Sequence, residues 1–187
     1  MGDSSIMATL KLNSYELFTQ SENNKPEFGT GVPSGTVLQV RTDLKTIGNT
    51  GDDADIQSTP ITATTFATGY TTNSLSITPY FSTSKILLMF NGMIEHSNAT
   101  NQGFEVYFAK DSIQLLTSGG NKNANMFVYT GGTGTQQYQP VSTSYDFIAG
   151  QTSSMILSVV ITKYSGTGTV NLQHDGTHHL IVMEIAA

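Results

Sequence analysis

The histidines are the residues of this 187-residue chain best suited to binding a metal ion. His174, His178 and His179 lie close together, and Asp175-Gly176 stands between the first two. Side chains alternate along a strand, so His178 and His179 would face opposite sides of a sheet and could not both bind one ion within a subunit. One histidine per chain could still meet its copies on a threefold axis. Because Asp-Gly is a strong hairpin-turn pair, we expect a polar hairpin tip here and no metal ion.

Carboxylates could serve as calcium ligands or as an acid and base pair. Residues 52–55 offer oxygen ligands, but they lack the spacing of an EF-hand loop, so we expect a solvated loop. Glu95 beside His96, or Glu105 with Asp111, could form the acid and base pair of a glycoside hydrolase. Their neighbours are not rich in aromatic residues, as a sugar-binding cleft would be. We therefore predict no catalytic residues and no enzyme activity.

Two further stretches resemble ligand sites only in part. Residues 131–134 are rich in glycine, but no Gly-Lys-Ser/Thr and no helix follows, so they do not form a phosphate loop. Tyr129, Tyr138 and Tyr145 stand among Thr, Asn and Gln and could form a glycan-binding face, although an ordinary β-surface explains them equally well. We predict no cofactor.

Composition excludes several classes of function. The chain has 8 basic and 14 acidic residues, a net charge of −6 and no cysteine. A nucleic-acid binder normally carries a basic patch, so this balance argues against nucleic acid as a partner. Without cysteine there is no disulfide and no thiolate metal site. No apolar run approaches the length of a membrane span, so we expect no membrane partner. Thr, Ser, Asn and Gly are abundant, which is common in β-rich extracellular and virion proteins.

Any functional residue must be positioned by strands. Short alternating segments recur every 8 to 15 residues, separated by turns of Gly, Asn and Ser. In the first, Leu38 and Val40 are expected on one side and Val37, Gln39 and Arg41 on the other. We therefore predict an all-β protein with an antiparallel β-sandwich or jelly-roll fold. The expected strands cover residues 35–45, 61–68, 74–78, 85–94, 103–108, 112–116, 126–129, 138–148, 154–164, 169–174 and 179–185.

The chain is organised around residues 77–92. Pro79 cannot donate a ladder hydrogen bond, so one strand should end there and a longer one begin at Lys85. That longer strand is apolar on both sides, and residues 154–164 show the same pattern. A lone sandwich needs only one apolar face per strand. We therefore expect a partner subunit to cover the second face.

Residues 1–34 differ from the rest of the chain. They hold too few periodic apolar residues for a core element, so we predict an extended N-terminal arm on a sandwich domain of residues 35–187. Residues 9–13 alternate and could add a strand to a neighbour's sheet. The alternative is a disordered terminus, and the two aromatic residues Tyr15 and Phe18 argue against it.

Several stretches together resemble a known family. Residues 32–40 (VPSGTVLQV) resemble the opening strand, Pro-x-Gly-Ser/Thr-Val-Ile/Leu-Gln-Val, of a β-sandwich domain found in structural proteins of tailed phages, notably marine and cyanobacterial ones. Residues 75–79 (LSITP) with 84–87 (SKIL) are similar to its central signature. Residues 182–186 are similar to its last strand and residues 7–13 to the short strand that precedes it. The resemblance covers residues 7–13 and 32–187.

This resemblance implies a homotrimeric virion protein on the capsid surface or in a tail appendage, and it carries no catalytic residues. The chain has no stalk or collagen-like repeat, which favours a capsid decoration (cement) protein bound to the major capsid protein. The alternative is a fibre or collar component whose loops 97–102 and 117–137 bind a host receptor or glycan. The residues predicted for the capsid anchor are Leu10, Leu12, Tyr15, Leu17 and Phe18, and those for the trimer seam are Leu87, Met89, Ile156 and Val160.

Overall fold

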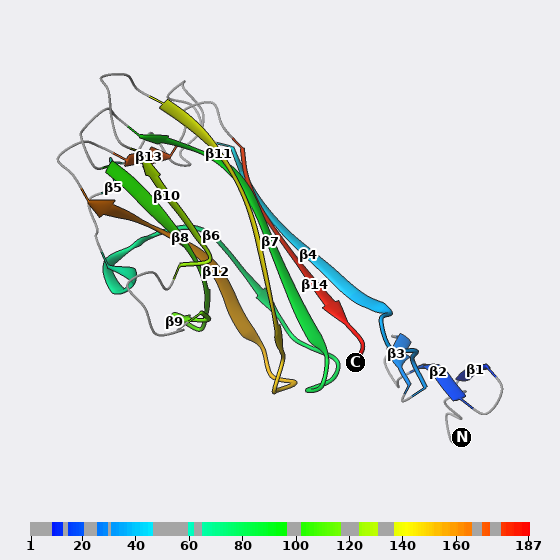
Figure 1. Cartoon of the computed structure of the whole chain (residues 1–187). Coiled ribbons are helices and arrows are strands. Elements are labelled where there is room, and N and C mark those ends of the chain that lie inside the picture. The colour runs from blue at the N-terminus through cyan, green and yellow to red at the C-terminus, as the bar shows by residue number, and fades with distance from the viewer. Residues whose placement is uncertain are drawn as a thin grey trace, which may run out of the picture.

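In the computed structural model of the chain, two antiparallel sheets pack against each other as a β-sandwich (Figure 1). This confirms the all-β sandwich predicted from the alternating segments. Long strands dominate both sheets, and the only helical element among the described residues is one turn of 3₁₀-helix. The structure describes residues 9–12, 15–20, 26–29, 31–46, 60–61, 65–96, 102–116, 124–130, 137–165, 170–172 and 177–187.

The larger sheet has six strands, in the order β4-β14-β7-β13-β5, and β11 pairs with the other edge of β7. Strand β7, which contains the second half of the organising stretch, therefore lies at the centre of this sheet. It pairs with β14 through residues 85–91 and with β11 along its whole length. The strands are β4 (Val37–Thr46), β5 (Pro60–Ile61), β7 (Lys85–His96), β11 (Gln137–Ile148), β13 (Val170–Leu172) and β14 (Thr177–Ile185).

The smaller sheet has five strands, in the order β10-β8-β12-β6, and β9 pairs with β8. The sequence predicts that the strands over residues 103–108 and 112–116 form a hairpin, and this is confirmed, because Lys110 pairs with Ile113. Its loop consists of Asp111 and Ser112, which have φ angles of 50° and 65°. The strands are β6 (Tyr70–Ile77), β8 (Gln102–Lys110), β9 (Ile113–Gln114), β10 (Met126–Thr130) and β12 (Met155–Ser165).

The hydrophobic core lies between the two sheets. Ile86, Leu88 and Phe90 on β7 are fully buried, whereas Leu87 and Met89 on the outer side of the same strand are only half-buried. The predicted apolar character of both sides of this strand is therefore confirmed. Fully burying a side chain of this size contributes about 2 kcal/mol, which explains why the inward positions determine the register.

The prediction that Leu38 and Val40 share a side was wrong. Leu38 is buried while Val40 is 49% exposed. The register between β4 and β14 shifts between Glu184 and Ile185, which pair with Gln39 and Val37. The extra residue is a β-bulge, and a bulge breaks the alternation on which the prediction depended. Beyond the bulge, the apolar side chains of β4 point outward.

The strand predicted over residues 61–68 was also wrong in its second half. The 3₁₀-helix η1 (Phe66–Thr68) occupies that part, and only Pro60–Ile61 forms a short strand. Gly69 then brings the turn against β12, where an added Cβ would meet the side chains of Val160 and Thr162. The turn therefore packs onto the outer surface of the smaller sheet, a tertiary contact that β-propensity does not report.

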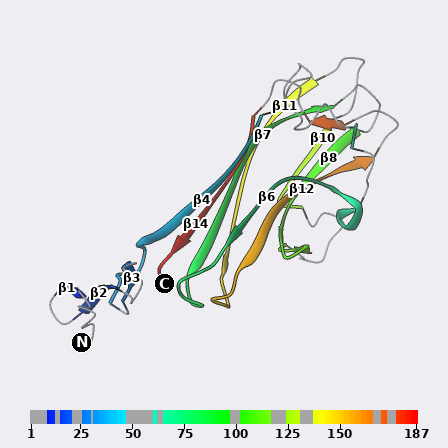
Figure 2. The ribbon, with the colours of Figure 1, turned by 180° about the vertical axis from the view of Figure 1, so that it is seen from behind.

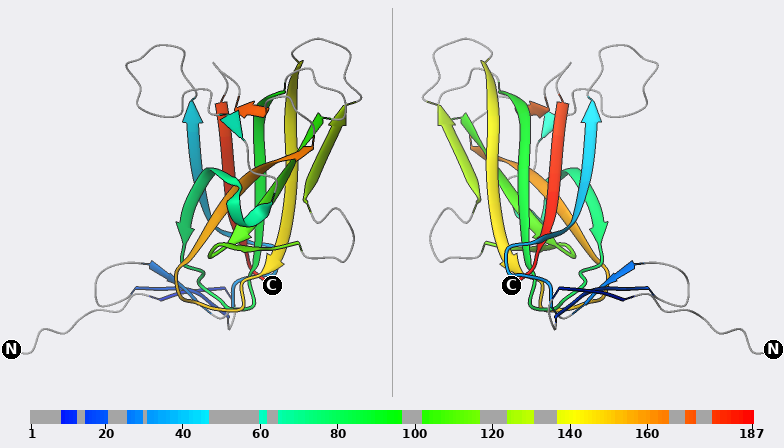
Figure 3. Two further views of the ribbon diagram at one scale, coloured as in Figure 1. Left: turned by 90° about the vertical axis from the view of Figure 1, so that its left-hand side faces the viewer. Right: turned by 90° about the vertical axis from the view of Figure 1, so that its right-hand side faces the viewer.

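The N-terminal segment forms a sheet of its own. Strands β1 (Thr9–Leu12), β2 (Tyr15–Gln20) and β3 (Pro26–Phe28) pair in the order β1-β2-β3. The described part of this segment is thus a small sheet, where an extended arm was predicted, and residues 9–12 pair within their own chain. Figures 2 and 3 show this sheet beyond the end of the sandwich where the C-terminus lies. The Phe28 ring contacts Tyr80 edge-on, with centroids 4.7 Å apart.

Candidate functional site

The outer face of the six-stranded sheet carries a group of apolar side chains on three adjacent strands, β4, β14 and β7, with Thr42 and His179 among them. In one row Leu87 pairs with Met183, which pairs with Val40. In the next row Met89 pairs with Ile181. In the right-hand view of Figure 3, β4 (cyan), β14 (red) and β7 (green) run side by side, and β11 (yellow) follows next to β7. We call this surface the apolar face, and it consists of Val40, Leu44, Leu87, Met89, Ile181 and Met183.

The apolar face has a polar border on strand β11. Ser144 and Asp146 of β11 pair with Met89 and Leu87. Asp146 also forms an ion pair with Lys85, with 3.3 Å between Oδ2 and Nζ. A contiguous apolar patch with a polar rim is typical of protein–protein interfaces and uncommon on a free monomer surface. This surface is therefore the strongest candidate for contact with another protein.

The four predicted seam residues do not share one face. Leu87 and Met89 lie on the apolar face, but Ile156 and Val160 lie on the outer side of the smaller sheet. Ile156 is 52% exposed there, whereas Val160 is 6% exposed because it packs with Phe66 and Tyr107 of its own chain. Val160 therefore offers little surface to a partner.

Sequence reasoning missed Val40, Leu44, Ile181 and Met183 as members of the apolar face. The sequence does contain a pattern that indicates Ile181 and Met183. Leu180 and Val182 are buried while Ile181 and Met183 are half-buried, so β14 is apolar on both sides as β7 is. Val40 could not be found in this way, because the bulge in β4 reverses its side.

The predicted anchor residues lie in the N-terminal sheet. Leu10 and Leu12 are on β1, and Tyr15, Leu17 and Phe18 are on β2. The structure brings the two segments together, because Leu10 pairs with Phe18 and Leu12 with Tyr15. Their side chains are outside what the structure describes, so the anchor stays a prediction.

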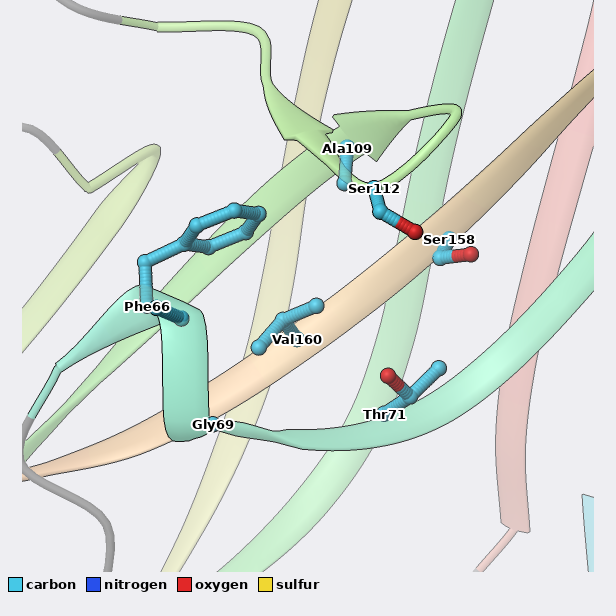
Figure 4. Close-up of a pocket in the computed structure, with 8 residues that line it drawn as sticks. Phe66, Gly69, Thr71, Ala109, Ser112, Ser158 and Val160 are labelled. Atoms are coloured by element: carbon cyan, nitrogen blue, oxygen red, sulfur yellow. The ribbon is translucent and has the colours of Figure 1, made fainter.

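A pocket of about 160 Å³ opens on the outer face of the smaller sheet. Figure 4 shows Val160 in its middle, the Phe66 ring on one side and Ser112 with Ser158 on the other. None of the eight described lining residues carries a charge. They are Phe66, Ala67, Gly69, Thr71, Ala109, Ser112, Ser158 and Val160.

Glu105 and Asp111, an acid and base pair that the sequence allows but does not favour, have separate partners. Glu105 accepts hydrogen bonds from Tyr107 at 2.5 Å and from Thr162 at 3.3 Å. Burial and the bond to Glu105 raise the pKa of Tyr107 to about 12, so its proton stays in place. Asp111 instead accepts from the Ile156 amide at 2.8 Å and holds the hairpin loop. Both carboxylates therefore have structural roles in the smaller sheet.

His178 is buried between the sheets and both of its nitrogens are engaged. Nε2 lies 2.9 Å from the Met93 carbonyl, so it carries the proton, and Nδ1 accepts from Thr72 at 2.9 Å. Asn73 donates to the His178 carbonyl and to Asp43, which ties β6 to both β14 and β4. His179 points outward, so the expected opposite orientation of the two histidines is confirmed. Among the described residues no group of three or more His, Cys, Asp or Glu could hold a metal ion.

The remaining candidates are only partly described. Tyr138 points outward and is 54% exposed, whereas Tyr145 points inward and donates to the Leu115 carbonyl at 3.4 Å. These two tyrosines therefore lie on opposite faces of β11. The Tyr129 and His96 side chains lie outside the described residues, as do His174, the acidic residues 52–55, the glycines at 131–134 and most of loops 97–102 and 117–137.

No known protein family matches the sequence, and no curated protein is significantly similar to it. In the parts of the chain that the structure describes, no helix is long and apolar enough to cross a membrane.

Proposed function

We propose that this chain is a structural protein of a tailed-phage virion, and specifically a homotrimeric capsid decoration protein. The observation that carries the proposal is the apolar face on strands β4, β14 and β7. A soluble sandwich gains nothing from exposed apolar side chains there, whereas a subunit interface buries them. The resemblance of residues 7–13 and 32–187 to phage structural domains supplies the virion setting.

The mechanism that we propose depends on valency. Three sandwiches associate through the apolar face, and their three N-terminal sheets contact neighbouring major-capsid subunits. After the first sheet binds, the other two bind at high effective concentration, so individually weak contacts give tight attachment. A protein that binds the assembled shell and not its separated subunits stabilises the shell by mass action.

Deleting residues 1–34 tests the attachment step. We expect the shortened protein to remain a folded trimer, because the apolar face and core lie outside the deleted segment. We also expect it to lose binding to capsids that lack the full-length protein, measured by co-sedimentation and electron microscopy. A shortened protein that still decorates capsids would show that the N-terminal sheet is not the anchor. Failure to find the full-length protein on purified virions would contradict the virion role itself.

A second candidate is a fibre or collar component that binds a host receptor or glycan. The uncharged, hydroxyl-lined pocket on the smaller sheet favours this function. Binding of the purified protein to host cells, compared with binding to empty capsids, separates the two candidates.

A further inference from the structure

Ser112 adopts a conformation that its residue type disfavours. It is the second residue of a two-residue hairpin loop with φ of 65°, a position that normally holds glycine. The neighbouring Asp111 also has a positive φ, but this cost is offset because its backbone and its side chain both form hydrogen bonds with Ile156. In the described part of the chain, the Ser112 hydroxyl has no hydrogen-bond partner within the protein. Residues whose strained backbone conformation is not offset by a hydrogen bond within the protein are often found at binding sites.

The Ser112 side chain lines the pocket, as Figure 4 shows. Two further hydroxyl-bearing side chains, Thr71 and Ser158, line it as well. Ser158 donates to Ser74 at 3.1 Å and keeps its acceptor capacity. Opposite these hydroxyls, Phe66 and Val160 supply an apolar wall and floor. The pocket therefore joins an apolar side to a hydrogen-bonding side.

Size and chemistry narrow the class of ligand. A volume of about 160 Å³ is close to that of the cavity of about 150 Å³ that holds one benzene molecule, so one six-membered ring fits. The absence of charge among the eight described lining residues favours a neutral ligand. A pyranose ring has an apolar C–H face, which suits the Phe66 ring, and a rim of hydroxyls, which suits Ser112, Ser158 and Thr71.

We propose that this pocket binds one neutral pyranose residue, such as the exposed end of a surface glycan. The pocket lies on the opposite sheet from the apolar face, so the inference does not rest on the assembly role. It deepens the second candidate function by naming a site and a ligand class, and it rests on that function only for its biological meaning.

The experiment measures binding of methyl glycosides of glucose, galactose, mannose and N-acetylglucosamine to the full-length protein. Saturation-transfer NMR and calorimetry detect affinities in the millimolar range expected of a single sugar. We expect at least one glycoside to bind. Ser112→Gly should weaken that binding at least about tenfold by removing a hydroxyl, while raising Tm because glycine relieves the backbone strain. Ser112→Ala, which keeps the Cβ, should weaken binding similarly, and Ser76→Ala on the same face should not.

Three results would overturn the inference. The first is that none of the glycosides binds. The second is that Ser112→Gly binds as tightly as the unaltered protein. The third is that toluene displaces the glycoside while Ser112→Ala has no effect, which would show an apolar site. Glycoside binding without attachment to host cells would keep the pocket and contradict only the receptor-binding function.

Discussion

Glu184 is fully buried and stabilises the connection between β6 of the smaller sheet and β7 of the larger sheet. Its Oε1 accepts from the Tyr80 and Phe81 amides at 2.8 and 3.3 Å, and its Oε2 accepts from Gln39 at 2.6 Å. These bonds satisfy backbone donors just after Pro79, where the chain crosses from one sheet to the other. A charged acceptor with three donors is the arrangement that makes burial of a carboxylate tolerable.

Glu184→Gln should lower the free energy of unfolding by about 2 kcal/mol. The new amide NH₂ would face the Gln39 donor, so at least one bond must be lost. Asp146→Asn is the matched control, because its ion pair with Lys85 is about half exposed and contributes at most about 1 kcal/mol. Urea denaturation measures both. Equal effects of the two substitutions would show that the Glu184 carboxylate does not stabilise the connection between β6 and β7.

His178 makes stability dependent on pH. Burial lowers its pKa below the usual 6.5, and the bond to the Met93 carbonyl opposes this only in part. Below pH 6.5 the unfolded state therefore binds more protons than the folded state, so stability is full above 6.5 and falls as the pH decreases. The slope from this group is at most about 1.4 kcal/mol per pH unit, and it reaches that value only well below pH 6.5, where the unfolded histidine is protonated and the folded one is not.

The measurement is urea denaturation of the native protein and of His178→Gln between pH 7.5 and 5. The variant should be less stable at neutral pH but should lack this part of the slope. His179→Gln, on the outward side of the same strand, is the control and should keep it. If the slope survives in His178→Gln, another group is responsible.

The 3₁₀ turn η1 is an element that covers part of its own sheet. Phe66 lies edge-on to Tyr107, with centroids 5.6 Å apart, and packs with Val160. This cover, and not a partner subunit, buries the apolar outer surface of β8 and β12 at that point. It also forms one wall of the pocket.

Gly69→Ala should destabilise the protein by about 1 to 3 kcal/mol, since the added Cβ overlaps the Val160 side chain and approaches Thr162 to 2.9 Å. Near-ultraviolet circular dichroism should also report a changed environment for Tyr107. Ala67→Ser, an exposed change in the same turn, is expected to stay within about 0.5 kcal/mol. If Gly69→Ala leaves the free energy of unfolding unchanged, the turn can move away from β12 without loss of stability.

At the scale of the whole molecule, the apolar face predicts association. The chain has a mass of 20.1 kDa, so a trimer would have about 60 kDa, which is three times that value. Leu87→Lys combined with Met89→Lys should give a folded monomer, because both side chains lie on the outer face and not in the core. Light scattering coupled to size exclusion measures the mass, and circular dichroism checks the fold.

Ser144→Lys, on the polar border next to Met89, serves as the control and should keep the oligomer. An unaltered protein of monomeric mass at micromolar concentration would contradict the assembly role of this face. So would a double variant that keeps the native mass.

Alternation of residue types is a local property, so the sequence by itself determined the all-β class, the 109–114 hairpin and the apolar outer side of β7. Only the tertiary structure decided that Val160 is covered by Phe66, that the bulge at Leu38 turns Val40 outward, and that His178 is locked between the sheets. Each of these contacts joins segments that are far apart in the chain, such as Thr72 and His178. Their meeting depends on how the sheets pack, which no local pattern records.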